Sequence, residues 1–150
     1  MDLDILTLSE THLNDLIEDS ELDIDSYHVI CKYRTRAGGG VAIYIKNSIV
    51  CKERPDLVEP ELEMIIIEVM MCNAKSFYMI VWYRPPTSTA STFRLLETVL
   101  QRLDDINSDY IVLGDINCDV LSIHKSWQTK CLTNLLNNFG LVQCIQSPTR

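Results

Sequence analysis

Two long apolar segments in the middle of the chain, Leu62–Met71 and Phe77–Tyr83, constrain the fold more than any other feature. Both are rich in β-branched and aromatic residues, which favour strands over helices. Only the short polar stretch Asn73–Lys75 separates them, so we predict a tight turn and an antiparallel pair. The second segment runs into Pro85 and Pro86, which cannot donate to a sheet and therefore end the strand.

Helical periodicity begins after these strands. Apolar residues recur every three or four positions through Phe93–Asp104, which predicts an amphipathic helix capped by Ser91 or Thr92. The same pattern predicts a second helix over Trp127–Phe139, ended by Gly140. Because we find no internal repeat or linker, strands and helices together predict one layered α/β (α+β) sandwich.

Shorter apolar runs predict the remaining strands. The consecutive glycines Gly38–Gly40 lead into a strand and not a helix, so they indicate a hairpin turn and not a phosphate-binding loop. Arg34 and Arg36 at its tip are interpreted as solvated charges, with a grip on nucleic acid as the alternative. The expected strands are Leu3–Leu8, Tyr27–Tyr33, Val41–Ile45, Tyr110–Leu113, Ile49–Lys52 and Leu141–Ile145, and Asn14–Asp25 is expected to be a short helix or ordered loop.

Polar side chains stand where three of these strands end. Glu10 follows the first strand, Tyr83 ends the central one, and Asp115 and Asn117 follow a run interpreted as a buried strand. Asp115 and Asn117 are two positions apart, so in extended backbone they would project to the same side. A carboxylate can hold Mg²⁺, a second can handle the proton of a water, and an amide and a phenol can bind phosphate oxygens. These residues predict part of a metal-assisted hydrolytic site.

Composition limits the partners of such a site. The net charge is −8, and residues 1–30 contain no Lys or Arg, so the chain lacks the basic surface of proteins that bind nucleic acid by charge alone. A bound Mg²⁺ would supply the positive charge instead. The N-terminus lacks a signal-peptide pattern and no apolar run is long enough to span a bilayer, which predicts an intracellular, non-secreted protein without a membrane partner. The six cysteines lack zinc-site spacing and are expected to be buried, reduced thiols.

Five short motifs, in this order, resemble the endonuclease/exonuclease/phosphatase family and, within it, the endonuclease domains of non-LTR (LINE-type) retrotransposons. The resemblance implies a four-layer αββα sandwich like that of deoxyribonuclease I and phosphoester cleavage dependent on Mg²⁺ (or Mn²⁺). The motifs are Ser-Glu-Thr-His-Leu at 9–13, Gly-Gly-Gly-Val-Ala-Ile-Tyr at 38–44, Tyr-Arg-Pro-Pro at 83–86, Gly-Asp-Ile-Asn at 114–117 and Ser-Pro-Thr-Arg at 147–150.

The same resemblance implies roles for individual residues. Glu10 is similar to the family's metal-binding glutamate and Tyr83 to its phosphate-contacting tyrosine. Asp115 is similar to the aspartate that handles the water or leaving-group proton, and Asn117 to the asparagine beside it. Three other polar residues match no catalytic position of the family and are expected to be surface or structural residues: His12, Asp119 and His124.

The family pattern also contains groups that these 150 residues do not supply. It begins with a further strand that carries an Asn, and it ends with a late Asp and a Ser-Asp-His motif. We therefore expect a partial domain without its first and its C-terminal strands, with exposed sheet edges and little or no activity of its own. In an intact parent, the resemblance implies target DNA and a reverse transcriptase domain as partners, and residence in the nucleus.

Two alternatives to a retrotransposon-type endonuclease stay open at this point. One is another branch of the family, an exonuclease or a phosphatase of sugars or lipids. The other is a non-catalytic remnant, a truncated or pseudogene-derived scaffold that binds other proteins.

Overall fold

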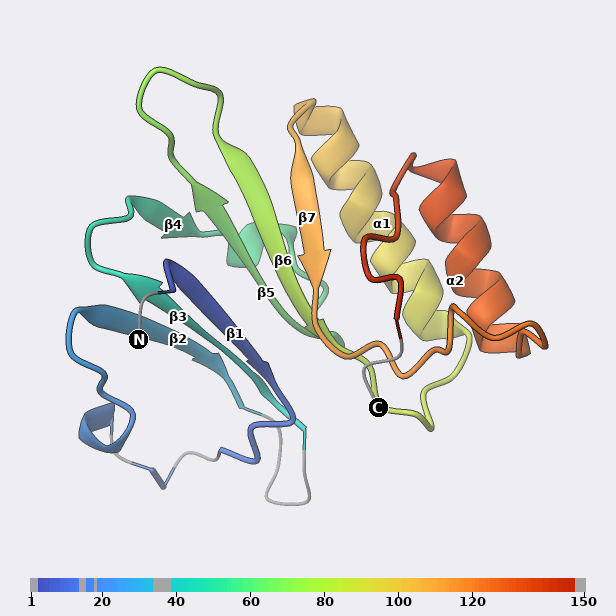
Figure 1. Ribbon diagram of the computed structural model, residues 1–150, viewed down its shortest axis with the longest axis horizontal. Coiled ribbons are helices and arrows are strands. Elements are labelled where there is room, and N and C mark those ends of the chain that lie inside the picture. Colours follow the sequence, from blue (N-terminus) through green and yellow to red (C-terminus); the bar gives the residue numbers. More distant parts are fainter. Residues whose placement is uncertain (1–2, 14–15, 18, 34–38, 148–150) are drawn as a thin grey trace.

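In the computed structural model, residues 3–13, 16–17, 19–33 and 39–147 are described. They form three layers: two helices cover a four-stranded sheet, and a three-stranded sheet packs against its other face (Figure 1). The predicted α/β (α+β) sandwich is therefore confirmed. Between the first two strands, the helical structure of the described residues is limited to a one-turn 3-10 helix, η1 (Asp19–Glu21).

The three-stranded sheet is antiparallel, with the strand order β1-β3-β2. Its central strand β3 is buried along most of its length because it lies between two neighbours and against the second sheet. The predicted hairpin of β2 and β3 is confirmed by their pairing, whereas Arg34, Arg36 and Gly38 lie outside the described residues. The strands are β1 (Ile5–Ser9), β2 (Tyr27–Lys32) and β3 (Val41–Lys46).

The four-stranded sheet has the order β4-β5-β6-β7. The predicted antiparallel pairing of its two long strands is confirmed over seven residue pairs, from Glu63 opposite Tyr83 to Val69 opposite Phe77. The 3-10 helix η2 (Pro55–Leu57) precedes these strands. The strands are β4 (Cys51–Glu53), β5 (Glu63–Val69), β6 (Phe77–Tyr83) and β7 (Tyr110–Leu113).

Strand β7 runs parallel to β6, because helix α1 (Ser91–Ile106) carries the chain back along the sheet before β7 begins. In the described part of the chain, β7 is paired on one side only, and Ile111 is 47% exposed. The prediction that this run is a buried strand is therefore wrong. Its residues are at most partly buried: Tyr110 and Val112 pack against the core under the helices, and Leu113 packs against the core between the sheets.

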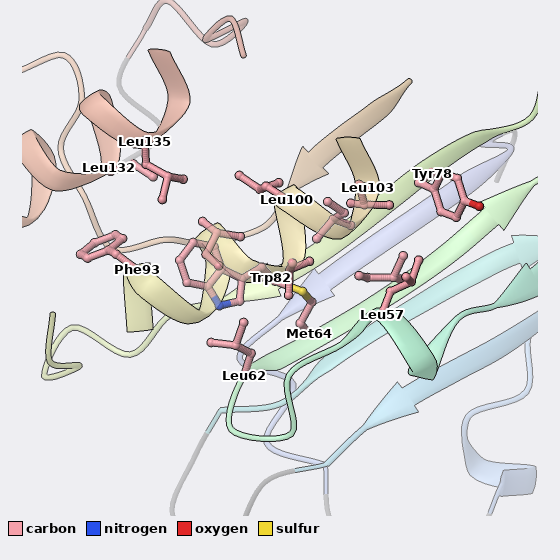
Figure 2. Packing of buried hydrophobic residues seen from close by; sticks show 14 residues of the cluster. Leu57, Leu62, Met64, Tyr78, Trp82, Phe93, Leu100, Leu103, Leu132 and Leu135 are labelled. Carbon is pink, nitrogen blue, oxygen red and sulfur yellow. The ribbon is translucent and has the colours of Figure 1, made fainter. Parts of the chain in front are cut away.

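The side chains of β5 and β6 alternate between two cores. Even-numbered residues such as Ile66 and Trp82 face the helices, where Trp82 and Phe93 meet edge to face with ring centroids 6.4 Å apart (Figure 2). Odd-numbered residues such as Ile67 and Tyr83 face the three-stranded sheet. Both faces of these strands are buried, which explains why their sequences are continuous apolar runs.

The two helices begin differently. Helix α1 has Ala90 as its N-cap without a side-chain hydrogen bond, so the predicted cap by Ser91 or Thr92 is wrong. Its first turn is held by backbone bonds alone, such as Phe93 N to Ala90 O at 3.2 Å. Helix α2 (Trp127–Asn138) follows a true cap, because the hydroxyl of Ser126 accepts from the Thr129 amide at 3.1 Å.

Gly140 terminates helix α2 just after its last residue, as predicted. Gly140 has a φ of +63°, and the Leu141 amide donates back to Leu136 O at 2.8 Å, which is a Schellman motif. Residues 141–147 then form no strand, so the prediction of a strand at Leu141–Ile145 is wrong. An apolar run needs a neighbouring strand to satisfy its backbone, and here Val142 is 82% exposed.

The cysteines are free, as predicted, but none is fully buried, so that part of the prediction is wrong. Cys72, Cys131 and Cys144 are exposed, and the others are partly buried. Within the described residues, no helix is long and apolar enough to cross a membrane.

Gly114 lets β7 lie close to β6. It has a φ of +124°, and a Cβ atom there would stand 2.0 Å from Trp82 O. We expect Gly114→Ala to lower the free energy of unfolding by about 2–5 kcal/mol, because it adds backbone strain and forces two strands apart. Urea denaturation measures this change.

Gly140→Ala is the matched control for Gly114→Ala. Gly140 also has a positive φ, but a Cβ there would meet nothing within 4 Å. We expect a loss of only about 1 kcal/mol from the strained backbone. Equal losses in the two variants would show that the close approach to Trp82 contributes nothing.

Candidate active site

The strands that carry the predicted site residues, β1, β6 and β7, finish at the same end of the sandwich (Figure 1). Two hydrogen bonds join these ends. The Asp115 amide donates to the hydroxyl of Ser9 at 3.3 Å, and the Arg84 amide donates to Asp115 O at 2.9 Å. Residues remote in sequence are thus held together across both sheets.

Glu10 and Tyr83 are in direct contact. The Tyr83 side chain is on the face of β6 that packs against the three-stranded sheet, and its hydroxyl donates to Glu10 Oε1 at 2.5 Å. Glu10 is exposed and has a φ of +54°, an unusual conformation for a residue with a side chain. The backbone beyond it is held by the His12 amide, which donates to Gly39 O at 3.0 Å.

The environment of Tyr83 keeps its hydroxyl protonated. Burial raises the pKa of Tyr83 to about 12, together with the hydrogen bond and charge of Glu10 and the charges of Glu63 and Asp115. Tyr83 is therefore a hydrogen-bond donor at neutral pH. These electrostatic effects also indicate that Asp115 and Glu63 stand near the phenol.

Asp115 and Asn117 meet through a tight turn and not through extended backbone, so the predicted geometry is wrong. Asn117 has a φ of +51°, and its amide donates to Asp115 Oδ1 at 3.0 Å. Its side-chain nitrogen donates to Arg84 O at 3.0 Å. The turn nevertheless places the carboxylate and the amide at the end of β7, with the side-chain oxygen of Asn117 left as an acceptor for a ligand.

Arg84 supports this turn and was not identified from the sequence. Its side chain is fully buried and donates to Ile116 O at 3.3 Å and Ser88 O at 3.0 Å. The guanidinium carbon lies 4.8 Å from the centre of the Phe93 ring, a cation–π contact. The signal was available, because Arg84 follows Trp82 by two positions and alternation places it on the helix side of the sheet.

Glu63 and Lys32 also stand at this end of the molecule and were not identified from the sequence. Glu63 pairs with Tyr83 across β5 and β6, and its carboxylate accepts from the Gly40 amide at 2.7 Å. Glu63, Lys32 and Tyr83 line a groove of about 320 Å³. Burial lowers the pKa of Lys32, against the opposing charges of Glu63 and Glu53. Lys32 ends β2 and Glu63 begins β5. A position at the end of a strand is the same feature that identified the predicted site residues.

The carboxylate oxygens of Glu10, next to Tyr83, suit a metal ion that needs few ligands from the protein. Among the described residues, no three His, Cys, Asp or Glu side chains are grouped closely enough to hold a metal ion. Mg²⁺ is commonly bound by one or two carboxylates, with water and substrate phosphate completing the shell. The exposed carboxylate of Glu10 fits that requirement, because one oxygen accepts from Tyr83 and the other is left for a cation.

Three residues match no catalytic position of the family: His12, Asp119 and His124. They lie on the surface or in a turn. His12 and His124 are exposed. Asp119 accepts from the amides of Leu121 and Ser122 at 3.1 and 3.0 Å, which makes it the residue that closes a turn. None of the three is hydrogen-bonded to Glu10 or Tyr83 in the bonds found for the described chain.

A family model described as the endonuclease/exonuclease/phosphatase family matches residues 1–140. The chain belongs to this family. The predicted resemblance to this family is thereby confirmed, and four of the five motifs, with Glu10, Tyr83, Asp115 and Asn117, fall within the matched region. A search of the curated proteins finds no match.

Two solved structures are similar to this chain to different degrees. The chain is similar to the endonuclease domain of TRAS1, a telomere-specific non-LTR retrotransposon, with a TM-score of 0.67 and 13% identity over 91% of this chain and 60% of that one. This likeness confirms the predicted deoxyribonuclease I-like fold, of whose four predicted layers the described residues form three. The chain spans 60% of the length of that domain. A second structure, ANGEL2, a 2′,3′-cyclic phosphatase, has a TM-score of 0.49 and 16% identity over 78% of this chain and 40% of that one.

The contact between Glu10 and Tyr83 predicts a change in the titration of Tyr83. In Glu10→Gln, we expect the pKa of Tyr83 to fall from about 12 toward the ordinary 10, remaining above it because burial persists. NMR of isotope-labelled tyrosine rings measures this pKa. A raised pKa favours folding at low pH, so the stability from Tyr83 is full below pH 10 and lost as the pH rises toward 12.

The control for this titration is Glu97→Gln, the same chemical change on the exposed face of α1. We expect it to leave the pKa of Tyr83 unchanged. If Glu10→Gln also left that pKa unchanged, the hydrogen bond between Glu10 and Tyr83 would not exist in solution.

Proposed function

We propose that this chain is part of a Mg²⁺-dependent phosphodiester hydrolase, a DNA endonuclease of the retrotransposon type. The observation that supports it most is the convergence of Glu10, Tyr83 and Asp115 at one end of two packed sheets. Members of the chain's family cleave phosphoesters, and the more similar of the two solved structures is a retrotransposon endonuclease domain.

Each side chain has a role suited to its surroundings. Glu10 would hold Mg²⁺ (or Mn²⁺), and the ion, when bound, would neutralise charge that develops on a phosphate oxygen. Tyr83 would donate its hydroxyl proton to a non-bridging oxygen, since its raised pKa keeps it a donor. Asp115 would orient a water or carry its proton, and Asn117 would hold the phosphate or the water.

DNA is the proposed substrate for two reasons. The motifs and the fold resemble retrotransposon endonucleases, and an acidic chain with a net charge of −8 can bind a phosphodiester through a metal ion. In a longer parent polypeptide, a reverse transcriptase domain would accompany this one, and the parent would act in the nucleus. A reverse transcriptase reading frame in the flanking coding sequence tests this partnership directly.

We also propose that these 150 residues have little activity alone. They contain no Ser-Asp-His sequence and no counterpart of the family's first Asn. Loss of one charged or hydrogen-bonding catalytic group commonly lowers the rate by about 10²–10⁴. Full activity would therefore need groups that these 150 residues do not supply.

Supercoiled plasmid DNA with Mg²⁺ tests the proposed activity. We expect the 150 residues to nick it no faster than background, and a polypeptide extended by the natural flanking sequence to nick it at least about 10²-fold faster. In the extended form, Asp115→Asn should lower the rate by about 10²–10⁴. A closed circle has no ends, so nicking also separates an endonuclease from an exonuclease.

The matched control is Asp105→Asn, the same change on the exposed surface of α1, which should keep the full rate. An extended polypeptide that folds but never cuts DNA would favour the non-catalytic alternative. Rapid nicking by the 150 residues, abolished by Asp115→Asn, would contradict the proposed inactivity.

Metal binding is measurable without catalysis. Paramagnetic Mn²⁺ broadens NMR signals of nearby nuclei, so we expect selective broadening around Glu10 and Tyr83 in the 150-residue chain. Glu10→Gln should remove this broadening, and Glu97→Gln should retain it. Equal broadening in both variants would show that Glu10 does not hold the metal.

A further inference from the structure

A second group of chemically active side chains lies at the opposite end of the sandwich. Strand β5 begins with Glu63 opposite Tyr83 at the candidate active site, and its last residue, Val69, pairs with Cys51 of β4. Cys51 Sγ lies 3.6 Å from Nε2 of His28, which belongs to β2 of the other sheet. The thiol and the imidazole therefore meet across the seam between the two sheets.

The third member of this group is Asn47, in the turn between β3 and β4. Its Oδ1 lies 3.3 Å from Nδ1 of His28. With the Asn47 oxygen as the acceptor, Nδ1 of the imidazole carries the hydrogen. In neutral histidine, this leaves Nε2 as an acceptor that faces the thiol of Cys51. A nucleophile, a base and a residue that orients the base are thus in line.

The position of each residue is fixed by the fold. The Asn47 amide donates to Ser26 O at 2.9 Å, which ties the turn to the strand that carries His28. The β2–β3 register places His28 opposite Ile45, two positions before Asn47. Cys51 is partly buried at the edge of the core between the sheets. Strands β2 and β4 and the turn before β4 therefore bring the three residues together at the surface.

Partial burial of Cys51 lowers the reactivity of its thiol. It raises the pKa of Cys51, so without help this cysteine would react more slowly than the exposed cysteines. A neighbouring base removes this disadvantage, because it takes the proton as the sulfur attacks. His28 and Asn47 also line a surface groove of about 460 Å³, so small molecules can approach the imidazole.

We propose that Cys51 is the preferred site of this chain for thiol–disulfide exchange with low-molecular-mass disulfides, with His28 as its base and Asn47 orienting the imidazole. The proposal is independent of the phosphodiesterase activity proposed above. It assigns a covalent modification site to the seam between the sheets.

The exchange balances with a small disulfide as the co-reactant. His28 Nε2 takes the proton of the Cys51 thiol, and the sulfur attacks one sulfur of the disulfide. A mixed disulfide forms at Cys51 as the original S–S bond breaks. The Cys51 sulfur is oxidised, and the departing sulfur is reduced and takes up the proton from His28.

Peptide mapping by mass spectrometry tests the proposal on the folded 150-residue chain at pH 7. Glutathione disulfide, added below saturation, should modify Cys51 at least about tenfold faster than exposed Cys72, Cys131 or Cys144. These three cysteines serve as internal references, because they give the rate of an accessible thiol that reacts without the help of His28. Faster modification at any of them would overturn the proposal, and this comparison needs no variant.

Variants then test the role of the base. His28→Gln should slow modification of Cys51 about tenfold or more and leave the exposed cysteines unchanged. Asn47→Ala, in an exposed turn, should slow Cys51 to a smaller extent because the imidazole is no longer held. Cys31 and Cys118 are partly buried, so faster modification of these two would reveal unfolding. An unchanged Cys51 rate in a folded His28→Gln variant would refute the role of His28.

Discussion

Strand β6 is buried on both faces, and the rest of the structure depends on this constraint. Its alternating side chains build two cores at once, one with the helices and one with the second sheet. The alternation continues past the end of the strand. Tyr83 consequently faces the seam between the sheets, where it meets Glu10, and Arg84 faces the helices, where it meets Phe93. The end of β6 therefore supplies the Tyr83 hydroxyl of the candidate site and also the Arg84 guanidinium that supports the turn at Ile116.

Backbone conformations that are unusual for ordinary residues gather around the same strand ends. Glu10 and Asn117 both have positive φ angles, and Gly114 has one that lets β7 approach Trp82 closely. Such conformations cost of order 1–3 kcal/mol each and persist only where surrounding contacts enforce them. Here the hydrogen bond that the buried Arg84 donates to Ile116 O and the one that the His12 amide donates to Gly39 O provide that enforcement. The site is therefore held rigid from both sheets.

Most of the fold could be predicted from the spacing of apolar residues. Each core strand or helix buries one or two of its faces, and the buried positions are apolar in the sequence. The errors have physical causes. The run at Tyr110–Leu113 has the composition of a buried strand but lies at an edge, since local sequence does not report the number of neighbours. The apolar residues at Leu141–Ile145 have no strand partner, which no local pattern reveals.

The candidate site was only partly predictable, for a related reason. Glu10, Tyr83, Asp115 and Asn117 stand at strand ends, a position that sequence reading can locate. The turn at Asn117 could not be foreseen, because it depends on the Arg84 carbonyl as a tertiary acceptor. Arg84 itself was overlooked, since a charged residue beside prolines is more often a solvated one.

The bonds that join the strand ends have a consequence for how the chain acquires its chemistry. The contact of Tyr83 with Glu10 closes a loop of 73 residues, and that of Asp115 with Ser9 closes one of 106. Contacts so remote in sequence form late in folding, after local hairpins and helices have shortened the effective loops. On the ribosome, Glu10 gains its partner only after Tyr83 has emerged, which is more than half of these 150 residues. In the described part of the chain β1 stays at the edge of its sheet, and the exposed charge of Glu10 at its end discourages pairing with other chains.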